Sequence, residues 1–448
     1  MPCACGDSTG PDRALQQPND AGSGGAVRRL FSTCMLRLFH TADWHLGQSF
    51  HGFDRDSEHA AFLAWLLETM VARRPDALLV AGDVFDSINP AATAQRRFFD
   101  FLARAHAALP ELQIVLTAGN HDAAARLEAP AGLLESLNIS VVGTVARDAA
   151  GEVDCTKFLV PLRDAASKVQ AIALAVPFLR PSDVPVLTEV ADPYLEGIRE
   201  LYRRTTDAAL ARHPGVPLIA LGHCHMQDGA ESRDSERRLV IGGTEALRAE
   251  TFPPELSYVA LGHLHRPQEL DGGRIRYSGS PIPLSFSERD YSHRVLEVLL
   301  DQSGLASVTS LPAPKTAALL RLPAGGAALI EDVLQCLSET TFDAALPPNT
   351  WPFLEVRVLD SGPDPTRRRR IETALEGKAV RLASIKLEAP DRSAVEHSAA
   401  APTLADLSSL DPEEIMIAAH REKYGSEPDA ALLAALREIL TAPAAAAS

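Results

Sequence analysis

The stretch Ala77-Leu78-Leu79-Val80-Ala81-Gly82-Asp83-Val84-Phe85-Asp86 joins a short apolar run to a polar cluster that holds two aspartates. An apolar run of this length, ended by glycine, is typical of a buried β-strand followed by a turn. Side chains placed just after strand ends converge at one edge of a sheet, where functional sites are usually built. The stretch therefore predicts a strand with chemically active residues at its end.

The same arrangement recurs elsewhere along the chain. Apolar runs precede polar clusters at Leu36–Phe39 with Asp43 and His45, at Gln113–Thr117 with Asn120 and His121, at Leu218–Leu221 with His223, and at Tyr258–Leu261 with His263 and His265. Two intervening segments have the apolar spacing of amphipathic helices, one with Phe62, Leu63, Leu66, Leu67 and Met70, the other with Phe98, Phe99, Leu102 and Leu109. Alternating strands and helices predict a layered α/β domain.

The polar residues of these clusters are of the types that bind divalent metal ions. Oxygen and imidazole ligands without thiolates suit Mn, Fe or Zn with open coordination positions. Two such ions about 3.5–4 Å apart can hold both the attacking and the leaving oxygen of a phosphoester. Asp83 is the best-placed residue to bridge such a pair. The candidate ligands are Asp43, His45, Asp83, Asn120, His223, His263 and His265.

Each cluster alone has an ordinary structural explanation. A single histidine after a strand is more often structural than a ligand, and Gly-Asp is common in turns. Several clusters of metal-binding residue types, each following a strand, are hard to explain as turns. Together they favour one functional site.

His121 is the candidate acid. Cleavage of a phosphoester needs a proton for the leaving oxygen, and imidazole titrates near neutral pH. Asp86 could accept a hydrogen bond from the other ring nitrogen of His121 and keep the ring protonated. Asp86 could instead cap the next helix, because Ser87 and Pro90 follow it, and the two roles are compatible.

Two further features receive lesser roles. We expect His225 in solvent or behind the ligands, because the candidate ligands already fill two metal sites. The Arg367–Arg370 run is expected on a solvated face rather than on phosphate groups. No Gly-x-x-x-x-Gly-Lys-Ser/Thr stretch occurs, so the chain has no phosphate-binding P-loop of its own.

The composition of the 448 residues is that of a globular protein, with 46% hydrophobic and 23% charged residues. The net charge of −16 argues against nucleic-acid binding through bulk positive charge, although it leaves room for a local basic groove or a metal-neutralised site. No apolar run is long enough for a membrane span, and the first residues do not resemble a secretory signal. The six cysteines are scattered, so we expect a reducing cytoplasm.

Composition and pattern divide the chain into five parts. Residues 1–34 are expected to be a disordered extension, with Met35 as an alternative start, and residues 35–310 form the α/β domain. Strand and helix patterns predict a small β-α-β-α-β domain over 311–388, followed by an Ala-, Pro- and Ser-rich linker over 389–406. Residues 407–448 have helix signals, including Ser409 or Asp411 as caps and an apolar face of Leu432, Leu433, Leu436, Ile439 and Leu440. They are expected to dock on a partner.

The order Asp-x-His, Gly-Asp-x-x-Asp, Gly-Asn-His-Asp, Gly-His, Gly-His-x-His resembles the calcineurin-like metallophosphoesterases. Longer stretches resemble the double-strand-break repair nucleases within that superfamily, above all in their bacterial branch. These stretches are His40–Gly47, Gly82–Asp86, Ala260–His265 and Arg276–Phe286.

The resemblance implies a fold, a site and partners. The fold would be a layered αββα sandwich with a small capping domain and C-terminal helices. One Mn²⁺ would be held by Asp43, His45, Asp83 and His265, and the second by Asp83, Asn120, His223 and His263, with His121 acting on the leaving group. Relatives cut duplex DNA ends 3′→5′ and open hairpins together with a coiled-coil ATPase, as a nuclease homodimer within a heterotetramer in the cytoplasm, at the nucleoid. Archaeal and eukaryotic relatives carry His at the position of Asp86, so its Asp matches the bacterial branch.

Two other functions are compatible with the sequence. One is a small-molecule phosphodiesterase or nucleotidase of the same superfamily, which would not need the extra domain and the C-terminal helices. The other is a DNA-end scaffold with an inactive metal site. The presence of His121 and of every ligand type argues against such a scaffold.

Overall fold

The computed structural model of the chain describes residues 35–164, 166–232, 246–389 and 412–441. Two six-stranded sheets form the larger domain. The first has the strand order β14 (Gly304–Pro312), β13 (Arg294–Asp301), β1 (Leu36–Thr41), β4 (Ala77–Ala81), β5 (Gln113–Thr117) and β6 (Ile139–Val142). The second has the order β11 (Gln268–Leu270), β12 (Ile275–Tyr277), β10 (Leu256–Gly262), β9 (Leu218–His223), β8 (Val169–Ala175) and β7 (Leu159–Arg163).

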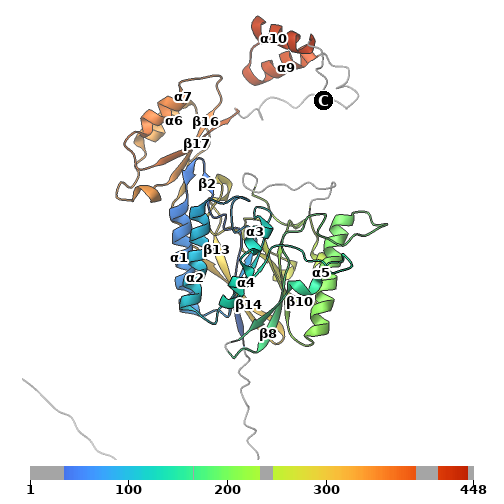
Figure 1. Ribbon diagram of the computed structural model, residues 1–448. Helices are drawn as coiled ribbons and strands as arrows, with labels where there is room; N and C mark the ends of the chain where they lie inside the picture. The colour runs from blue at the N-terminus through green and yellow to red at the C-terminus, as the bar shows by residue number, and fades with distance from the viewer. Residues whose placement is uncertain (1–34, 165, 233–245, 390–411, 442–448) are drawn as a thin grey trace, which may run out of the picture. The chain divides into compact units, whose positions relative to one another are not determined.

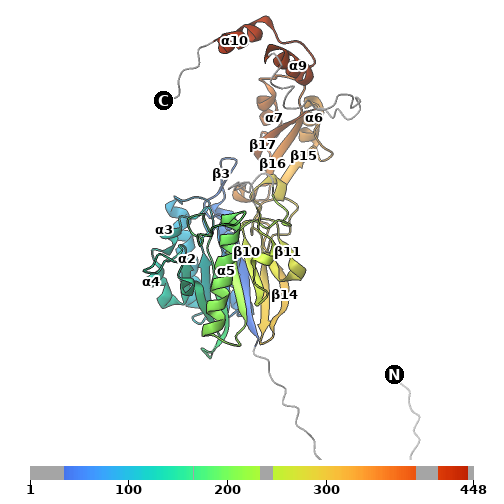
Figure 2. The same cartoon turned by 90° about the vertical axis from the view of Figure 1, so that its right-hand side faces the viewer.

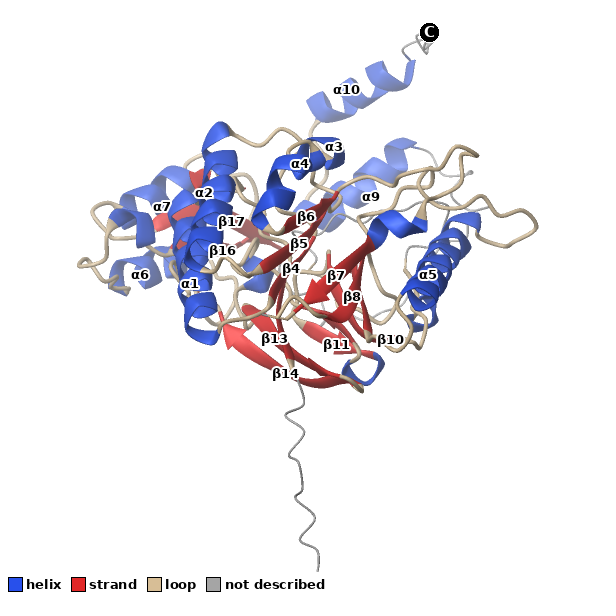
Figure 3. Cartoon of the chain, turned by 60° about the horizontal axis from the view of Figure 1, so that its bottom comes forward, coloured by secondary structure: helices blue, strands red, loops and turns tan. Residues whose placement is uncertain are grey.

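The two sheets pack face to face, and helices cover their outer faces (Figures 1 and 3). Helices α1 (Asp56–Arg73) and α2 (Ala92–Ala108) lie on the first sheet, with the short helices α3 (Ala124–Glu128) and α4 (Ala131–Leu134) beside them. Helix α5 (Pro193–Arg212) lies on the second. The predicted αββα sandwich is therefore confirmed.

Strand β4 is apolar at every position because both of its faces are buried. On β4, Leu79 points into the core between the two sheets, whereas Leu78 and Val80 join the core beneath α1 and α2. A strand presents successive side chains to opposite faces, so one short run serves both cores. The parallel pairing of β1 with β4, of β4 with β5 and of β9 with β10 brings their carboxyl ends to one edge of each sheet.

The two helices predicted from apolar spacing are present, with one error. All five predicted apolar residues of α1 are buried, and the helix ends where Arg74 adopts a left-handed conformation and donates to the Met70 carbonyl. On α2, Phe98 and Leu102 are buried, but Phe99 is 40% exposed. Successive helical residues are about 100° apart, so Phe99 turns away from the face that Phe98 presents.

The small domain has its own parallel sheet of β15 (Leu319–Leu322), β16 (Phe353–Leu359) and β17 (Arg381–Glu388), with α6 (Ile330–Glu339) and α7 (Arg367–Leu375) packed on it (Figure 2). The predicted β-α-β-α-β order is thus present. The predicted boundary at residue 311 falls inside β14, which pairs with β13 as far as Pro312. Its apolar Leu311 packs in the core of the larger domain, which is why the strand continues past the predicted end.

The C-terminal helices are α9 (Pro412–Tyr424) and α10 (Ala430–Thr441), joined by the ion pair of Arg437 with Glu413. The remaining elements are short: the hairpin strands β2 (Ser49–Phe50) and β3 (Phe53–Asp54), and 3₁₀ turns at η1 (Glu135–Leu137), η2 (Cys155–Phe158), η3 (Ala249–Thr251), η4 (Asp271–Gly273), η5 (Phe286–Glu288) and η6 (Pro348–Thr350). The predictions for residues 1–34, for nearly all of the linker and for the caps Ser409 and Asp411 lie outside the described residues. Among the described residues, no helix combines the length and the apolarity that crossing a membrane requires.

Candidate metal centre

The candidate ligands lie on loops that leave the carboxyl ends of five strands. Asp43 follows β1, Asp83 follows β4 and Asn120 follows β5, whereas His223 ends β9 and His263 follows β10. The first three strands belong to one sheet and the last two to the other. The site therefore forms where the same edges of the two packed sheets meet, as the order of apolar runs and polar clusters predicted.

The backbone at this edge is strained and closely packed. Asp43, His45, Asp83 and His263 all have positive φ angles, which cost energy in residues other than glycine and concentrate at functional sites. Gly82 is required next to them, because a Cβ atom there would lie 2.2 Å from Nδ1 of His223. The fold thus accepts backbone strain in order to hold these side chains together.

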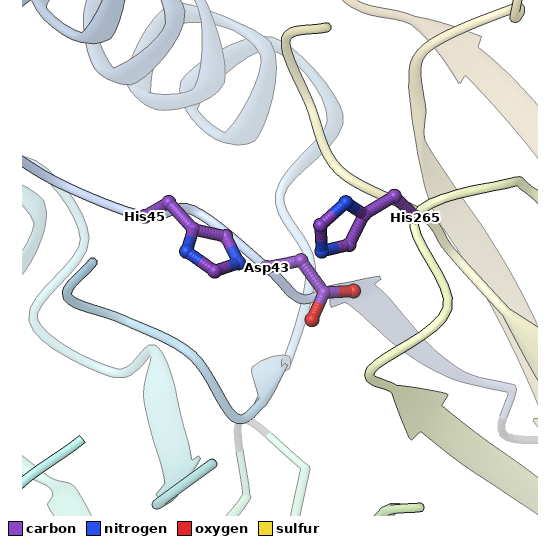
Figure 4. Close-up of side chains that lie close together, drawn as sticks. All are labelled: Asp43, His45 and His265. Atoms are coloured by element: carbon purple, nitrogen blue, oxygen red, sulfur yellow. The ribbon is translucent and has the colours of Figure 1, made fainter. Parts of the chain in front are cut away.

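One group of ligand atoms comes from Asp43, His45 and His265. Their candidate ligand atoms lie within 4.8 Å of one another, and all three side chains are buried. Figure 4 shows Asp43 and His45 reaching the site from one loop and His265 from another. Oδ2 of Asp43 and Nε2 of His45 are buried without a hydrogen-bond partner, which is costly unless a cation binds there. These residues fit a divalent metal ion.

A second group surrounds the side chain of Asn120. Its Oδ1 lies 2.9 Å from Nε2 of His223 and 3.1 Å from Nδ1 of His263. Nε2 of His223 is also 3.3 Å from Oδ2 of Asp83. One carboxylate, one amide oxygen and two imidazoles again form an oxygen and nitrogen set without thiolates, which suits the same class of metal ion.

Asp83 lies between the two groups. Its Oδ2 is 3.5 Å from Nε2 of His45 in the first group and 3.3 Å from Nε2 of His223 in the second. Its other oxygen, Oδ1, accepts a hydrogen bond from the backbone N–H of His121 at 2.8 Å. The carboxylate is therefore fixed with one oxygen facing both groups, which is the position of a bridging ligand.

Three of the histidines are held by a partner at Nδ1, which leaves Nε2 facing the site. Nδ1 faces Oδ1 of Asp86 at 3.1 Å in His45, Oε1 of Glu288 at 2.9 Å in His265, and the Ala81 carbonyl at 2.9 Å in His223. Carboxylates and carbonyls accept hydrogen bonds, so Nδ1 carries a hydrogen and Nε2 is the nitrogen that can bind a metal. Such partners are typical of metal-binding histidines.

The electrostatics of the site favour a bound cation. Burial lowers the pKa of His45 and of His263, so both rings are neutral at neutral pH and can donate a lone pair. Burial alone would lower the pKa of His223, yet Asp83 and Asp43 raise it to about 9. Burial would raise the pKa of Asp83, but His223, His45 and His121 lower it below its usual range. Positive charge is therefore stabilised next to Asp83, where a metal ion would compete with protons.

His121 lies beside the first group with its Nδ1 bound elsewhere. Nδ1 is 2.8 Å from the backbone carbonyl of Asp86, and the ring centroid is 4.8 Å from that of His45. The expected contact between His121 and the Asp86 carboxylate is wrong, because that carboxylate binds His45 instead. Asp86 does not cap α2 either, since the helix begins after Ala91 and has no side-chain cap.

A third set of nearby atoms, from His45, Asp86 and His121, also lies within 4.8 Å. In this set Asp86 already binds both rings, His45 through its carboxylate and His121 through its backbone carbonyl. We therefore interpret it as a hydrogen-bonded support for the first group rather than a separate metal site.

The two features that were given lesser roles are placed partly as expected. His225 lies outside the ligand groups, with Nε2 3.3 Å from Oε1 of Glu231 and its ring 6.4 Å from that of His263. Arg368 and Arg370 pair with Glu372 and Glu331 on an exposed face. Arg367 differs from the prediction: it is buried and donates to the Gly362 carbonyl, because it lies on the inner side of the first turn of α7.

Sequence reasoning missed two buried carboxylates. Asp122 accepts hydrogen bonds from the backbone N–H groups of Val84, Phe85 and Gly119, so it ties the Asp83 loop to the Asn120 loop. Its place in Gly119-Asn120-His121-Asp122 was the available signal, but two of its partners, Val84 and Phe85, lie on another loop. Glu288 contacts His265 and is separated from it by 23 residues, so no local spacing indicated the pair.

Comparison with known proteins agrees with this geometry. Residues 36–267 match the calcineurin-like phosphoesterase family, and residues 316–424 match the type 5 capsule protein repressor C-terminal domain. A protein of Rhodobacter capsulatus, named as the D component of the nuclease SbcCD, is 44% identical over 389 residues, covering 86% of this chain and 94% of the relative. The chain belongs to the SbcD family of nuclease subunits.

Proteins of the same name from other bacteria support this membership. The Escherichia coli K12 relative is 34% identical over 382 residues, covering 83% of this chain and 90% of the relative. The Bacillus subtilis 168 relative is 33% identical over 338 residues, covering 72% and 80%. Members of the SbcD family are metal-dependent phosphodiester hydrolases, and the predicted family and fold are confirmed. The chain therefore depends on a divalent metal, for which the two ligand groups are the candidate site.

Proposed function

We propose that this chain is a Mn²⁺-dependent nuclease that degrades duplex DNA ends in the 3′→5′ direction and opens DNA hairpins. It would act in DNA repair and recombination as the nuclease subunit of an SbcCD-type complex in the bacterial cytoplasm, at the nucleoid. Its membership of the SbcD family supports the substrate. The observation that supports the reaction is the position of Asp83 Oδ2 between two groups of metal-binding atoms.

In this proposal the centre holds two ions. Asp43, His45, Asp83 and His265 bind one, and Asp83, Asn120, His223 and His263 bind the other. When bound, such a pair neutralises the charge of a phosphodiester and activates water for in-line attack. The oxygen and imidazole ligands are compatible with Mn²⁺, although other divalent ions suit them as well.

The protein's own contribution to the chemistry is a positioned proton donor. The Asp86 carbonyl holds Nδ1–H of His121, so Nε2 is the nitrogen that can deliver a proton to the leaving oxygen. Asp86 also holds His45 through its carboxylate, so one residue orients both the acid and a ligand. The positive φ of His45 brings its ring against that of His121.

The alternatives have less support. A small-molecule phosphodiesterase has no need of the small domain that contains β15, β16 and β17, or of α9 and α10. An inactive scaffold would have no reason to keep buried, unpartnered ligand atoms on Asp43 and His45, which lower stability unless a metal binds.

A cleavage assay tests the proposal. The purified chain is incubated with a radiolabelled DNA hairpin, a blunt duplex and a chromogenic phosphodiester, each with Mn²⁺ and with excess EDTA. We expect Mn²⁺-dependent cleavage of both DNA substrates and no cleavage with EDTA. Rapid turnover of the chromogenic ester with intact DNA would instead identify a small-molecule enzyme, and no turnover of any substrate would identify a scaffold.

We further propose that an SbcC-type coiled-coil ATPase is the partner, in a heterotetramer that contains two copies of this chain. The name of the relatives supports this assembly, since each is named as one component of SbcCD. Helices α9 and α10 are the candidate docking segment, because Leu432 on α10 is 44% exposed. A short helix pair with an exposed leucine is typical of a segment that binds a groove on another protein.

Changing the exposed side of α10 should weaken assembly and leave cleavage intact. Leu432→Glu places a charge on a side chain that would be buried at the interface, where a leucine contributes about 1.5–3 kcal/mol. We expect at least a tenfold loss of ATPase binding in a pull-down titration, with unchanged Mn²⁺-dependent cleavage of short DNA. Ala434→Glu, at another exposed position of α10, is the matched control. Wild-type capture of the ATPase by Leu432→Glu would rule out this face of α10 as the main dock.

A further inference from the structure

A buried carboxylate, Glu288, lies directly behind His265. It belongs to η5, and the exposed fractions of the His265 and Glu288 side chains are only 3% and 0%. Oε1 of Glu288 is 2.9 Å from Nδ1 of His265. Because a carboxylate accepts hydrogen bonds, Nδ1 carries the hydrogen, and the lone pair of this imidazole is on Nε2.

Glu288 is itself held in a fixed orientation. Its Oε2 accepts from the backbone N–H of Leu284 at 2.8 Å and from the hydroxyl of Ser280 at 3.2 Å. Its backbone carbonyl lies 3.2 Å from Nε2 of His293, whose Nδ1 binds the Ser280 carbonyl at 2.8 Å. The loop from Ser280 to His293 is therefore built around this one carboxylate.

The three histidines anchored at Nδ1 differ in the kind of anchor. His223 binds a neutral backbone carbonyl, and His45 binds Asp86, whose side chain is 35% exposed. Only the His265 anchor, among these three, is a charged group fully removed from solvent. Water screens a buried charge least, so Glu288 acts on its ligand more strongly than Asp86 does on His45.

We propose that Glu288 is a positioning residue for the metal centre. It fixes the tautomer and the orientation of His265, and its negative charge makes the imidazole a better electron-pair donor to the ion of the first group. The inference rests on the proposed two-ion centre. It assigns to Glu288 a role in metal affinity, separate from any contact with DNA.

The test is the number of Mn²⁺ ions bound by the purified full chain and their affinities, measured by calorimetry and by electron paramagnetic resonance of free Mn²⁺. Glu288→Gln removes the negative charge. The glutamine amide has a single acceptor oxygen, so it cannot accept from both Nδ1–H of His265 and the Leu284 N–H. We expect one ion to bind as in the wild type and the other to bind roughly 10–100-fold more weakly. Asp290→Asn is the matched control, because that carboxylate is 79% exposed two residues away, and it should bind both ions normally.

The outcomes separate the inference from the proposed function. Two ions with wild-type affinities in Glu288→Gln would overturn the role of Glu288 while the two-ion centre stands. A wild-type chain that binds no Mn²⁺ would overturn both. If circular dichroism shows that the metal-free Glu288→Gln chain is unfolded, Ser280→Ala is the variant that tests the role of Glu288. This change keeps the charge of Glu288 and removes one hydrogen bond to its Oε2. Weaker binding of one ion by Ser280→Ala supports the role, and unchanged binding contradicts it.

Discussion

Asp83→Ala should abolish cleavage and empty both metal sites. Oδ2 of Asp83 lies within 3.5 Å of ligand nitrogens from both groups, so its removal takes a ligand atom from each group. Loss of both ions removes several kcal/mol of transition-state stabilisation, which corresponds to a fall in the cleavage rate of roughly 10⁴-fold. Metal content by inductively coupled plasma mass spectrometry and hairpin cleavage in Mn²⁺ are the two measurements.

The matched control for this change is Asp100→Ala. Asp100 is an exposed aspartate on α2, remote from the ligand loops, so its loss should change neither metal content nor cleavage. Circular dichroism of both variants checks that the fold is retained. If Asp83→Ala keeps two ions per chain, Asp83 does not bridge them.

His121→Gln should separate chemistry from metal binding. The Nδ1–H of His121 donates to the Asp86 carbonyl, and its other ring nitrogen is the one assigned to the leaving group. Glutamine can donate a hydrogen bond but does not exchange a proton near neutral pH. We expect DNA cleavage to fall by about 10²–10⁴-fold, the usual share of general acid catalysis, while the chain keeps both ions.

Metal content and single-turnover cleavage rates check this expectation. His213→Gln is the matched control, because His213 lies at the far end of α5 and outside the ligand groups. If His121→Gln loses an ion, His121 is a ligand, and the group formed by His45, Asp86 and His121 is a metal site after all.

The sequence predicts the strand ends and their ligands because that information is local. A run such as Ala77–Ala81 is apolar throughout, since both faces of β4 are buried, and the residues after it are aimed by the sheet itself. Parallel pairing then brings Asp43 and Asp83 to one edge, although they are far apart in the chain. Neither step depends on the conformation of a long loop.

The contacts behind the ligands could not be predicted in this way. The Asp86 carboxylate was expected on His121, but it binds His45, because the loop after β4 places the backbone carbonyl of Asp86, rather than its side chain, against His121. Glu288 reaches His265 only after the chain has formed β11, β12 and a long loop. Loop backbone angles decide both contacts, and a pattern of residue types does not specify them.

Two ions bridged by Asp83 are central to the proposed mechanism, and an anomalous difference map from a crystal soaked in Mn²⁺ tests them directly. We expect two peaks about 3.5–4 Å apart, with Oδ2 of Asp83 between them. One peak should lie among Asp43, His45 and His265, and the other among Asn120, His223 and His263. A single peak, or a peak among His45, Asp86 and His121, would contradict it.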